Sequence, residues 1–579
     1  MLAGARFDPD TAVAVVDDVT GSLDAKLLRL AIPRTPTELV HWGATLRRPR
    51  LVQPEDVASV RLGLAELAGW TGEPGTLPAG SDREVLHGAV AVLGRRARAL
   101  MKEINRESLI TMALANHDAL VAEGSAWRQM ASALLSSHRD QPDVIATYNA
   151  GESERGTAML ASRVIVEMAV CESPENLGRV ASTIDFDALM ADVATFIQCA
   201  QQDDALHWKL AARPPVVEGN GSITSDPLYF AVEHMPYMLA RGERTFRTSA
   251  GDFADPSSDE VAPELDPLFL KAVQSELGMG LQAYISFIGN LAQEAANLGA
   301  VVLRLTRAEV WDRMREASSD LGSIDVERAF EALTLKPRRR WDDPKPKDAA
   351  PRDWYPWRNS RRLSLLHRPM VQIEAGGDLT TLVAPALLDQ NLNRLFRAYA
   401  GLLPEGLFSS KDMQSWIGRA VDRDGHAFNL QVARRLGELG WQTVHDRKLT
   451  QFGGSEQLGD IDVLAWDPVS GVVHAIECKR LQPARTVGEI GERLAEYGTL
   501  SSPGDNMTPI EKHFNRLNFL STNLTALSEF TKIPEETIDL RSALVTDCLM
   551  PMQFSHRPMA FVDIVCDFAS LKNALPIGP

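Results

Sequence analysis

Residues 459–481 read GDIDVLAWDPVSGVVHAIECKRL, and this stretch decides the fold of the C-terminal part of the chain. It contains two runs rich in β-branched and other apolar residues, which favour strands. Between them, residues 467–471 read DPVSG, and Asp, Pro, Ser and Gly each favour a turn. The pattern therefore predicts a β-hairpin.

The register of this hairpin follows from its turn. If the two strands are symmetric about residues 467–471, Asp462 lies opposite Glu477 and Asp460 lies opposite Lys479. Side chains alternate between the two faces of a strand, so these four polar side chains share one face. The opposite face carries Ile461, Val463, Ile476 and Cys478. We expect the apolar face to be buried and the polar face to gather carboxylates that repel one another without a cation.

Two facing carboxylates provide the oxygen ligands that Mg2+ or Mn2+ prefers, with water at the remaining positions. Lys479, two residues beyond Glu477, reaches the same space. There it can orient or deprotonate a metal-bound water and offset charge that develops on a phosphate. The site therefore predicts metal-assisted hydrolysis of phosphodiesters.

At these residues the sequence resembles the PD-(D/E)XK nuclease superfamily, in which an acidic residue is followed on the next strand by Glu-x-Lys. The segments GDIDV and IECKR are most similar to the restriction-endonuclease-like, Holliday-resolvase-like and NERD-like branches. The resemblance implies that Asp462 and Glu477 bind the metal, that the carbonyl of Cys478 completes the metal site, and that Lys479 is the catalytic lysine. It also implies an endodeoxyribonuclease that depends on Mg2+ or Mn2+, in restriction or defence against foreign DNA, with RNA an open alternative substrate.

The chain departs from the family pattern on the first helix. The run GHAFNLQVARRLGELGW at 425–441 predicts an amphipathic helix that stops at Gly440, followed by a strand over 441–452. Family members often carry a glutamate where this chain has Asn429, and an amide is a poorer metal ligand than a carboxylate. Asp460 is a candidate substitute, and Arg480 is a further candidate for support of the site.

The chain has 579 residues, too many for one hydrophobic core, so we expect several domains. The predicted divisions are an unassigned segment over 1–83, a mainly helical domain over 84–335, a connector over 336–403 and a nuclease-like domain over 404–579. The expected fold class is a mainly α region followed by a restriction-endonuclease-like α/β domain with a mixed central sheet. Within the connector, MVQIEAGGDLTTLVAP at 370–385 predicts a β-hairpin, and a helix is expected after it.

The helical domain is recognised from its periodicity. The run HGAVAVLGRRARALMKEI at 87–104 places apolar residues three and four apart, with basic residues on the other side. Such stripes predict a packed bundle and assign no activity. A protein partner, or self-association, is the role considered for this region.

The connector is basic and aromatic, and two interpretations of it stay open. Its candidates for nucleic-acid contact are Arg338, Arg339 and Arg340, and its aromatic residues are Trp341, Trp354, Tyr355 and Trp357. In one interpretation the basic groups contact phosphates and the rings stack on unpaired bases. In the other, the segment is a solvated linker whose tryptophans pack onto a neighbouring domain. Lys512 and Arg516, on one predicted helix face, are further phosphate candidates, although a solvated face explains them equally.

The bulk composition limits the function. A formal net charge of -17 argues against a general DNA-coating protein, although an enzyme needs only a local positive path to its site. The five cysteines include no CxxC pair and predict neither a disulfide framework nor a cysteine zinc site. No signal sequence or membrane span is expected, so we predict a cytoplasmic protein without a membrane partner.

A second functional hypothesis belongs to a different class. The chain would then be a catalytically inactive nuclease-fold protein that serves as a nucleic-acid-binding or protein-scaffolding module. A fold does not by itself establish an activity, so metal binding separates the two hypotheses.

Overall fold

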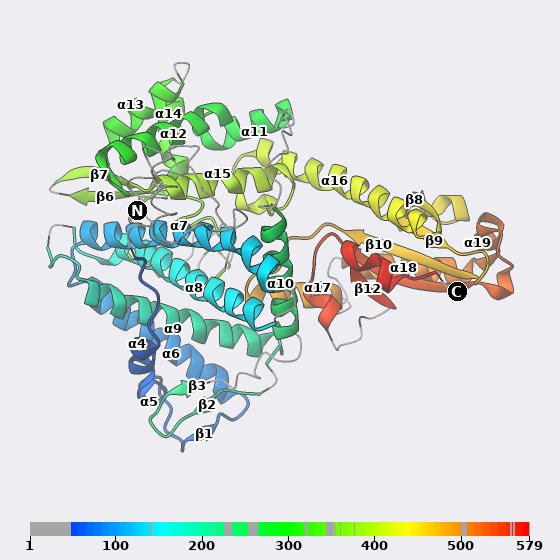
Figure 1. Cartoon of the computed structure of the whole chain (residues 1–579), viewed down its shortest axis with the longest axis horizontal. Coiled ribbons are helices and arrows are strands. Elements are labelled where there is room, and N and C mark those ends of the chain that lie inside the picture. Colours follow the sequence, from blue (N-terminus) through cyan, green and yellow to red (C-terminus); the bar gives the residue numbers. More distant parts are fainter. Residues whose placement is uncertain are drawn as a thin grey trace, which may run out of the picture.

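The computed structural model describes residues 48–138, 142–175, 177–211, 213–224, 234–252, 265–318, 322–342, 353, 355–358, 361–375, 377–498, 507–555, 559 and 562–577. They form a mixed α/β structure in which helices predominate. Figure 1 shows a broad helical body and, on its right, a narrower part built on strands β8 to β12, with α16 running between the two. Residues 1–47, most of the unassigned N-terminal segment, lie outside the described ranges.

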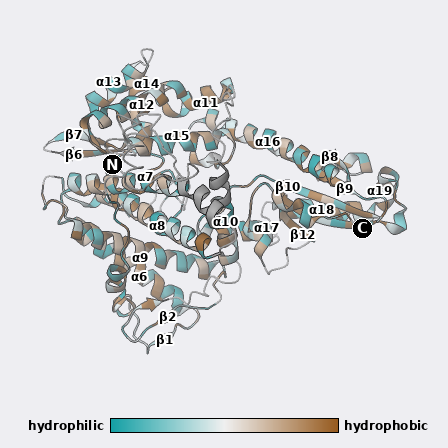
Figure 2. Cartoon of the chain, viewed as in Figure 1, coloured by the Kyte–Doolittle hydropathy of each residue, from teal (hydrophilic) through white to brown (hydrophobic). Residues whose placement is uncertain are grey.

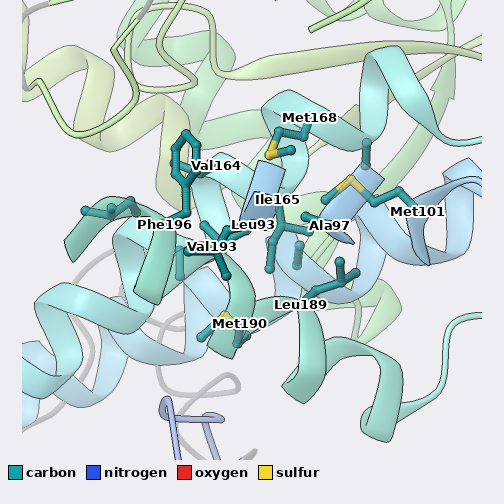
Figure 3. Close-up of a cluster of buried hydrophobic side chains, with 14 of the residues drawn as sticks. Leu93, Ala97, Met101, Val164, Ile165, Met168, Leu189, Met190, Val193 and Phe196 are labelled. Atoms are coloured by element: carbon teal, nitrogen blue, oxygen red, sulfur yellow. The ribbon is translucent and has the colours of Figure 1, made fainter. Parts of the chain in front are cut away.

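The first layer of the helical body consists of long helices. It comprises α4 (Pro54–Arg61), α5 (Leu64–Leu67), α6 (Ser81–Met101), α7 (Arg106–His138), α8 (Pro142–Glu172), α9 (Thr183–His207) and α10 (His234–Asp252). Figure 3 shows Leu93 of α6, Ile165 of α8 and Leu189 of α9 pointing toward one another in a shared core. Leu93 and Ala97, from the stripe predicted over 87–104, are buried there. None of the described helices is long and apolar enough to cross a lipid bilayer.

Two small sheets accompany these helices. The first is antiparallel and comprises β1 (Gly75–Thr76), β2 (Val216–Val217) and β3 (Ile223–Thr224). The second has the order β4-β7-β6-β5 and comprises β4 (Leu303–Thr306), β5 (Thr334–Leu335), β6 (Met370–Ala375) and β7 (Asp378–Val383). The hairpin predicted from the connector is thus present as β6 and β7, which pair antiparallel. It is part of the helical body, because its outer strands β4 and β5 come from residues before 336.

A second layer of helices lies on the other face of this sheet. It comprises α11 (Pro267–Leu277), α12 (Leu281–Leu298), α13 (Arg307–Ala317), α14 (Ser323–Leu333) and α15 (Pro385–Tyr399). Successive residues of β6 contribute to different cores: Met370 lies in the core of the second layer, and Val371 lies in the core of the first layer. The period of two along the strand therefore separates two helical cores.

The connector lies against the helical body. The rings of Trp341 and Trp357 meet the ring of Phe196 of α9 edge-on, with centroids 6.0 and 5.8 Å apart. Arg361 is buried and donates to both carboxylate oxygens of Glu167 of α8, at 2.9 and 2.8 Å. Trp354 lies outside the described residues. The described tryptophans pack as the linker interpretation expects, and phosphate contact by the connector stays a prediction.

α16 (Lys411–Glu438) is longer than the helix predicted from residues 425–441. Its first half places Met413 and Trp416 in the core of the second layer. Its second half places Phe428 and Val432 against the C-terminal sheet. The helix ends as expected before Gly440, which has the left-handed φ of 101° that favours glycine.

The C-terminal sheet has the order β12-β11-β10-β9-β8. Its strands are β8 (Gln442–Lys448), β9 (Asp460–Trp466), β10 (Val472–Lys479), β11 (Asp539–Thr546) and β12 (Ile564–Asp567). The strands β8, β9 and β10 run antiparallel and β10, β11 and β12 run parallel, so the predicted mixed sheet is present. The strand predicted over 441–452 ends at Lys448, because Leu449–Phe452 turns into a 3-10 helix.

Helices cover both faces of this sheet. Those that follow β10 are α17 (Val487–Gly498), α18 (Pro509–Thr522), α19 (Leu524–Thr531) and α20 (Leu571–Ala574). Val463 and Ile476 pack with α16 on one face, whereas Leu464 and Trp466 pack with α18 and α19 on the other. The expectation of a single apolar face was wrong, because strands covered by helices on both faces bury both sets of side chains. Figure 2 shows the resulting brown, hydrophobic colouring along β10.

We predict that Glu167→Ala destabilises the helical body by about 3–5 kcal/mol, because it leaves the buried Arg361 guanidinium without its carboxylate. Glu154→Ala, at an exposed position of the same helix, is the matched control and should change stability by less than about 0.5 kcal/mol. Thermal unfolding of both variants at one scan rate measures the difference. Equal melting temperatures for the two variants would contradict the prediction.

Candidate nuclease site

The β9–β10 ladder places Asp462 beside Glu477. Its pairs run from Val473 with Trp466 to Ile476 with Val463, and the next pair in the same register is Asp462 with Glu477. The turn sets this register: Asp467 accepts hydrogen bonds from the N–H groups of Val469 at 3.0 Å and Ser470 at 3.2 Å. The register predicted from the sequence is confirmed as far as the ladder extends.

Three predicted site residues come together where β9 begins and β10 ends. The Nζ of Lys479 lies 2.6 Å from Oε1 of Glu477 and 3.6 Å from Oδ2 of Asp462. The N–H of Cys478 donates to the same Oδ2 of Asp462 at 2.8 Å. The main chain of β10 therefore fixes the orientation of the Asp462 carboxylate.

Helix α18 brings two further side chains to Glu477. The Nη1 of Arg516 donates to Oε2 of Glu477 at 2.8 Å, and Nδ1 of His513 lies 3.4 Å from the same oxygen. The other ring nitrogen of His513 lies 2.8 Å from Oγ of Ser542 on β11. Arg516 was predicted as a phosphate contact, and no sequence pattern indicated that Arg516 and His513 contact Glu477. Lys512, the neighbouring phosphate candidate, is exposed and shares none of these contacts.

The charges in the site largely balance. Burial opposes ionisation of Glu477, yet His513, Lys479 and Arg516 hold its pKa below its usual range. Burial and then Glu477 raise the pKa of Asp462 above its usual range. The two carboxylates also raise the pKa of Lys479 against the effect of its burial. The carboxylates were expected to repel one another in the absence of a metal cation. This expectation was wrong, because Lys479 and Arg516 neutralise the charges of Asp462 and Glu477.

Two of the supporting candidates lie apart from this cluster. Asp460 pairs with Lys448 across the β8–β9 ladder. No hydrogen bond or ion pair between described residues joins it to Glu477 or Lys479. The Nη1 of Arg480 donates to Asp424 of α16 at 2.5 Å, so this arginine braces β10 against α16.

Asn429 contacts a carboxylate that was not predicted from the sequence. It is buried and donates to Oδ1 of Asp446 at 2.7 Å. His426 and His445 place Nδ1 at 3.2 and 3.1 Å from the same carboxylate. Burial opposes ionisation of Asp446, but Asn429 and the two histidines hold its pKa below the usual range. Asp446 belongs to β8, the neighbour of the strand that carries Asp462, so its carboxylate is held on the side of the sheet where the family pattern has a helix glutamate. The run HDRK at 445–448 is the local sequence pattern that could have indicated Asp446 as a site residue.

The donor set suits a hard divalent ion that keeps several waters. The described ranges contain no group of three or more His, Cys, Asp or Glu side chains suited to a metal ion, so Asp462 and Glu477 would supply two carboxylates. Between described residues, Oδ1 of Asp462 takes part in no hydrogen bond and stays available as a ligand. The side chain of Cys478 is buried in the core beneath the sheet, which leaves only its main chain for the predicted metal role.

We predict that the two carboxylates differ in their effect on stability in EDTA. Asp462→Asn keeps an acceptor for the Cys478 N–H and removes a charge that burial disfavours, so the variant should melt at or above the wild-type temperature. Glu477→Gln leaves Arg516 and Lys479 without their shared carboxylate and should cost about 1–3 kcal/mol. Thermal unfolding in EDTA tests this, with Glu438→Gln on the exposed end of α16 as control. A similar loss in both site variants would contradict the assigned partners.

The comparisons with known proteins concern most of the chain. A family model described as anti-phage protein Upx-like matches residues 78–564. No curated protein matches, and no solved structure matches. The matched residues begin before α6 and end at the first residue of β12, so they include the helical body together with the site. A role in phage defence agrees with the expectation drawn from the resemblance. The chain therefore belongs to the Upx-like family of anti-phage proteins.

Proposed function

We propose that this protein acts against phage by hydrolysing phosphodiester bonds of DNA, in a reaction that depends on Mg2+ or Mn2+. The observation that carries the proposal is the convergence of Asp462, Glu477 and Lys479, with the Lys479 Nζ 2.6 Å from one carboxylate and 3.6 Å from the other. The resemblance to PD-(D/E)XK nucleases and the anti-phage family support it from two directions.

The residues of the site would have different roles in the reaction. Asp462 and Glu477 would hold the divalent ion, which when bound polarises a phosphoryl oxygen and makes its water more acidic. Against the effect of burial, Glu477 and Asp462 raise the pKa of Lys479, and its protonated amine would offset negative charge on the phosphoryl group. Arg516 and His513 are positioning residues, because both contact Glu477.

Three basic side chains near the C-terminal sheet are candidates for contact with the substrate backbone. Strand β8 lies at the edge of the sheet and carries Arg447 and Lys448, and α18 carries the exposed Lys512. These cations flank the strand ends that hold the site, where they can meet phosphates of the substrate backbone. In the connector, Arg340 is paired with Asp342 at 2.9 Å, and nucleic-acid contact by Arg338, Arg339 and Arg340 remains a further hypothesis.

A second candidate function is favoured by one observation. Lys479 and Arg516 already satisfy Glu477 without a metal ion. A site whose charges are already paired without a metal ion is sufficient for a catalytically inactive nuclease-fold module that binds nucleic acid or a protein partner. Calorimetric titration with Mn2+ separates the two functions: the nuclease requires binding that is lost in Asp462→Asn, and the inactive module requires none.

The nuclease assay uses the full chain. Supercoiled plasmid, linear duplex, single-stranded DNA and RNA are each incubated with the purified protein in Mg2+, Mn2+ or EDTA. Cleavage of DNA in the presence of either metal and its absence in EDTA supports the proposal. Absence of cleavage of every substrate in both metals would refute it, and cleavage of RNA alone would reassign the substrate.

We predict that Lys479→Ala lowers the cleavage rate by at least roughly 10²–10³, the usual effect of removing one group that stabilises transition-state charge. Lys572→Ala, at an exposed position of α20 in the same part of the chain, is the matched control and should cleave at the wild-type rate. Plaque assays on cells that express each variant should show loss of protection only for Lys479→Ala. Wild-type cleavage by Lys479→Ala would remove this residue from the mechanism.

A further inference from the structure

Asp446 has a strained backbone at the edge of the C-terminal sheet. It lies within the edge strand β8, yet its φ of 50° is in the left-handed region, which L residues rarely adopt in a strand. The buried amide of Asn429 on α16 donates to its carboxylate at 2.7 Å and holds the side chain in place. Strain that neighbouring contacts maintain in this way is frequent at functional sites.

The strand register places Asp446 beside the candidate nuclease site. The β8–β9 ladder keeps one register on both sides of this residue, so Asp446 occupies the position opposite Asp462. Asp462 is in turn beside Glu477 in the register of the β9–β10 ladder. Neighbouring strands lie about 4.8 Å apart. Asp446 therefore belongs to the same row across the sheet as the two carboxylates of the site.

His426 of α16 and Asp446 form an Asp–His pair. The Nδ1 of His426 lies 3.2 Å from Oδ1 of Asp446, and the side chain of His426 is 63% exposed. Because Nδ1 faces the carboxylate, Nε2 lies on the opposite edge of the ring, and it makes no hydrogen bond or ion pair with another described residue. A carboxylate bound to one imidazole nitrogen orients the ring and stabilises its protonated form.

The charged groups around His426 favour this protonated form. The hydrogen bond and the charge of Asp446 raise the pKa of His426 above its ordinary value of 6.5, against a smaller effect of burial. Asp460 of β9 and Asp422 of α16 raise it further. His445 of β8 shares the carboxylate, with Nδ1 3.1 Å from Oδ2, and is the other titratable group of this cluster. A pKa close to the working pH suits a group that gives up a proton in a reaction.

The roles proposed for the nuclease site leave one proton unassigned. In phosphodiester hydrolysis the oxygen that leaves phosphorus takes the electron pair of the broken bond and needs a proton. His513 is 2% exposed, and both of its ring nitrogens have partners, in Glu477 and Ser542. His426 is exposed and has one ring nitrogen without a described partner, so it can exchange protons with a substrate and with solvent.

We propose that His426 is the general acid of this hydrolysis and that Asp446 is its positioning residue, an inference that rests on the proposed nuclease function. As the oxygen of a water molecule bonds to phosphorus, the bond from phosphorus to the leaving oxygen breaks, and its electron pair passes to that oxygen. Nε2 of protonated His426 donates the proton that the leaving oxygen needs. The attacking water loses one proton to solvent, and the neutral imidazole regains one from solvent.

The first test compares cleavage rates of full-length variants. His426→Gln should lower the rate of DNA cleavage by roughly 10²–10⁴, the usual contribution of general acid–base catalysis. His87→Gln is the matched control, because it removes a similar Asp–His pair from α6 of the helical body. The Nε2 of His87 lies 3.0 Å from Asp203, and its side chain is 61% exposed. This control should cleave at the wild-type rate.

A substrate with a better leaving group isolates the proton transfer. Sulfur replaces the leaving oxygen at one scissile bond of an oligonucleotide, on the 3′ or 5′ side that the product ends identify. A thiolate leaves without a proton, so His426→Gln should recover most of the wild-type rate on this substrate. Lys479→Ala should stay slow on it, because the proposed role of Lys479 does not involve the leaving atom.

The pH dependence tests the role of Asp446. A general acid must be protonated, so the wild-type cleavage rate should fall as the pH rises through the pKa of His426. Asp446→Asn removes the charge that raises this pKa, so the fall should begin at a lower pH. The fall should be absent in His426→Gln. Thermal unfolding at each pH shows that folded proteins are compared.

The outcomes separate this inference from the proposed nuclease function. Wild-type cleavage of the ordinary substrate by His426→Gln overturns the general acid and leaves the nuclease in place. Equal losses by this variant on the oxygen and sulfur substrates also overturn it, because the missing group would then not act on the leaving atom. A wild-type protein that cleaves neither substrate overturns both proposals.

Discussion

The burial of α16 in two separate cores is the constraint on which the arrangement of the molecule depends. Met413 and Trp416 occupy the core of the second helical layer, and Phe428 and Val432 occupy the core under the C-terminal sheet. A continuous α-helix satisfies its backbone hydrogen bonds internally and behaves as a rigid rod over this length. The bond from Arg480 to Asp424 attaches the end of β10 to the middle of the same helix. This helix therefore joins the candidate site to the helical body.

The helical body also contacts the segment that follows β10. The hydroxyl of Tyr237 and the Nη1 of Arg241, both on α10, donate to the carbonyl of Ala484 at 3.0 and 2.8 Å. Ala484 belongs to the segment between β10 and α17, which begins just after the site. The family match extends over both the helices and the sheet, and these contacts give a physical reason for treating them as one unit.

Buried charged groups in this molecule are of two kinds, paired and unpaired. Glu477 and Glu167 are buried acids that form ion pairs. Glu477 pairs with Lys479 and Arg516, and Glu167 pairs with Arg361. Arg394, by contrast, is buried, and its Nη2 has no hydrogen-bond partner among the described residues. Fully paired charges stabilise one arrangement, whereas an unpaired buried charge costs free energy.

The sequence by itself determined the local parts of this protein. The period of two along a strand and the DPVSG turn were sufficient to place Asp462 opposite Glu477, because each depends only on neighbouring residues. The contacts that complete the site depend on packing between distant segments. Arg516 and His513 reach Glu477 only because α18 folds onto that face of the sheet, and Asp446 is oriented by Asn429 from α16. No local pattern encodes such contacts. The sequence therefore determined which residues the hairpin brings together, and the tertiary structure decided their charge partners, since burial and long-range packing control where charges find counter-ions.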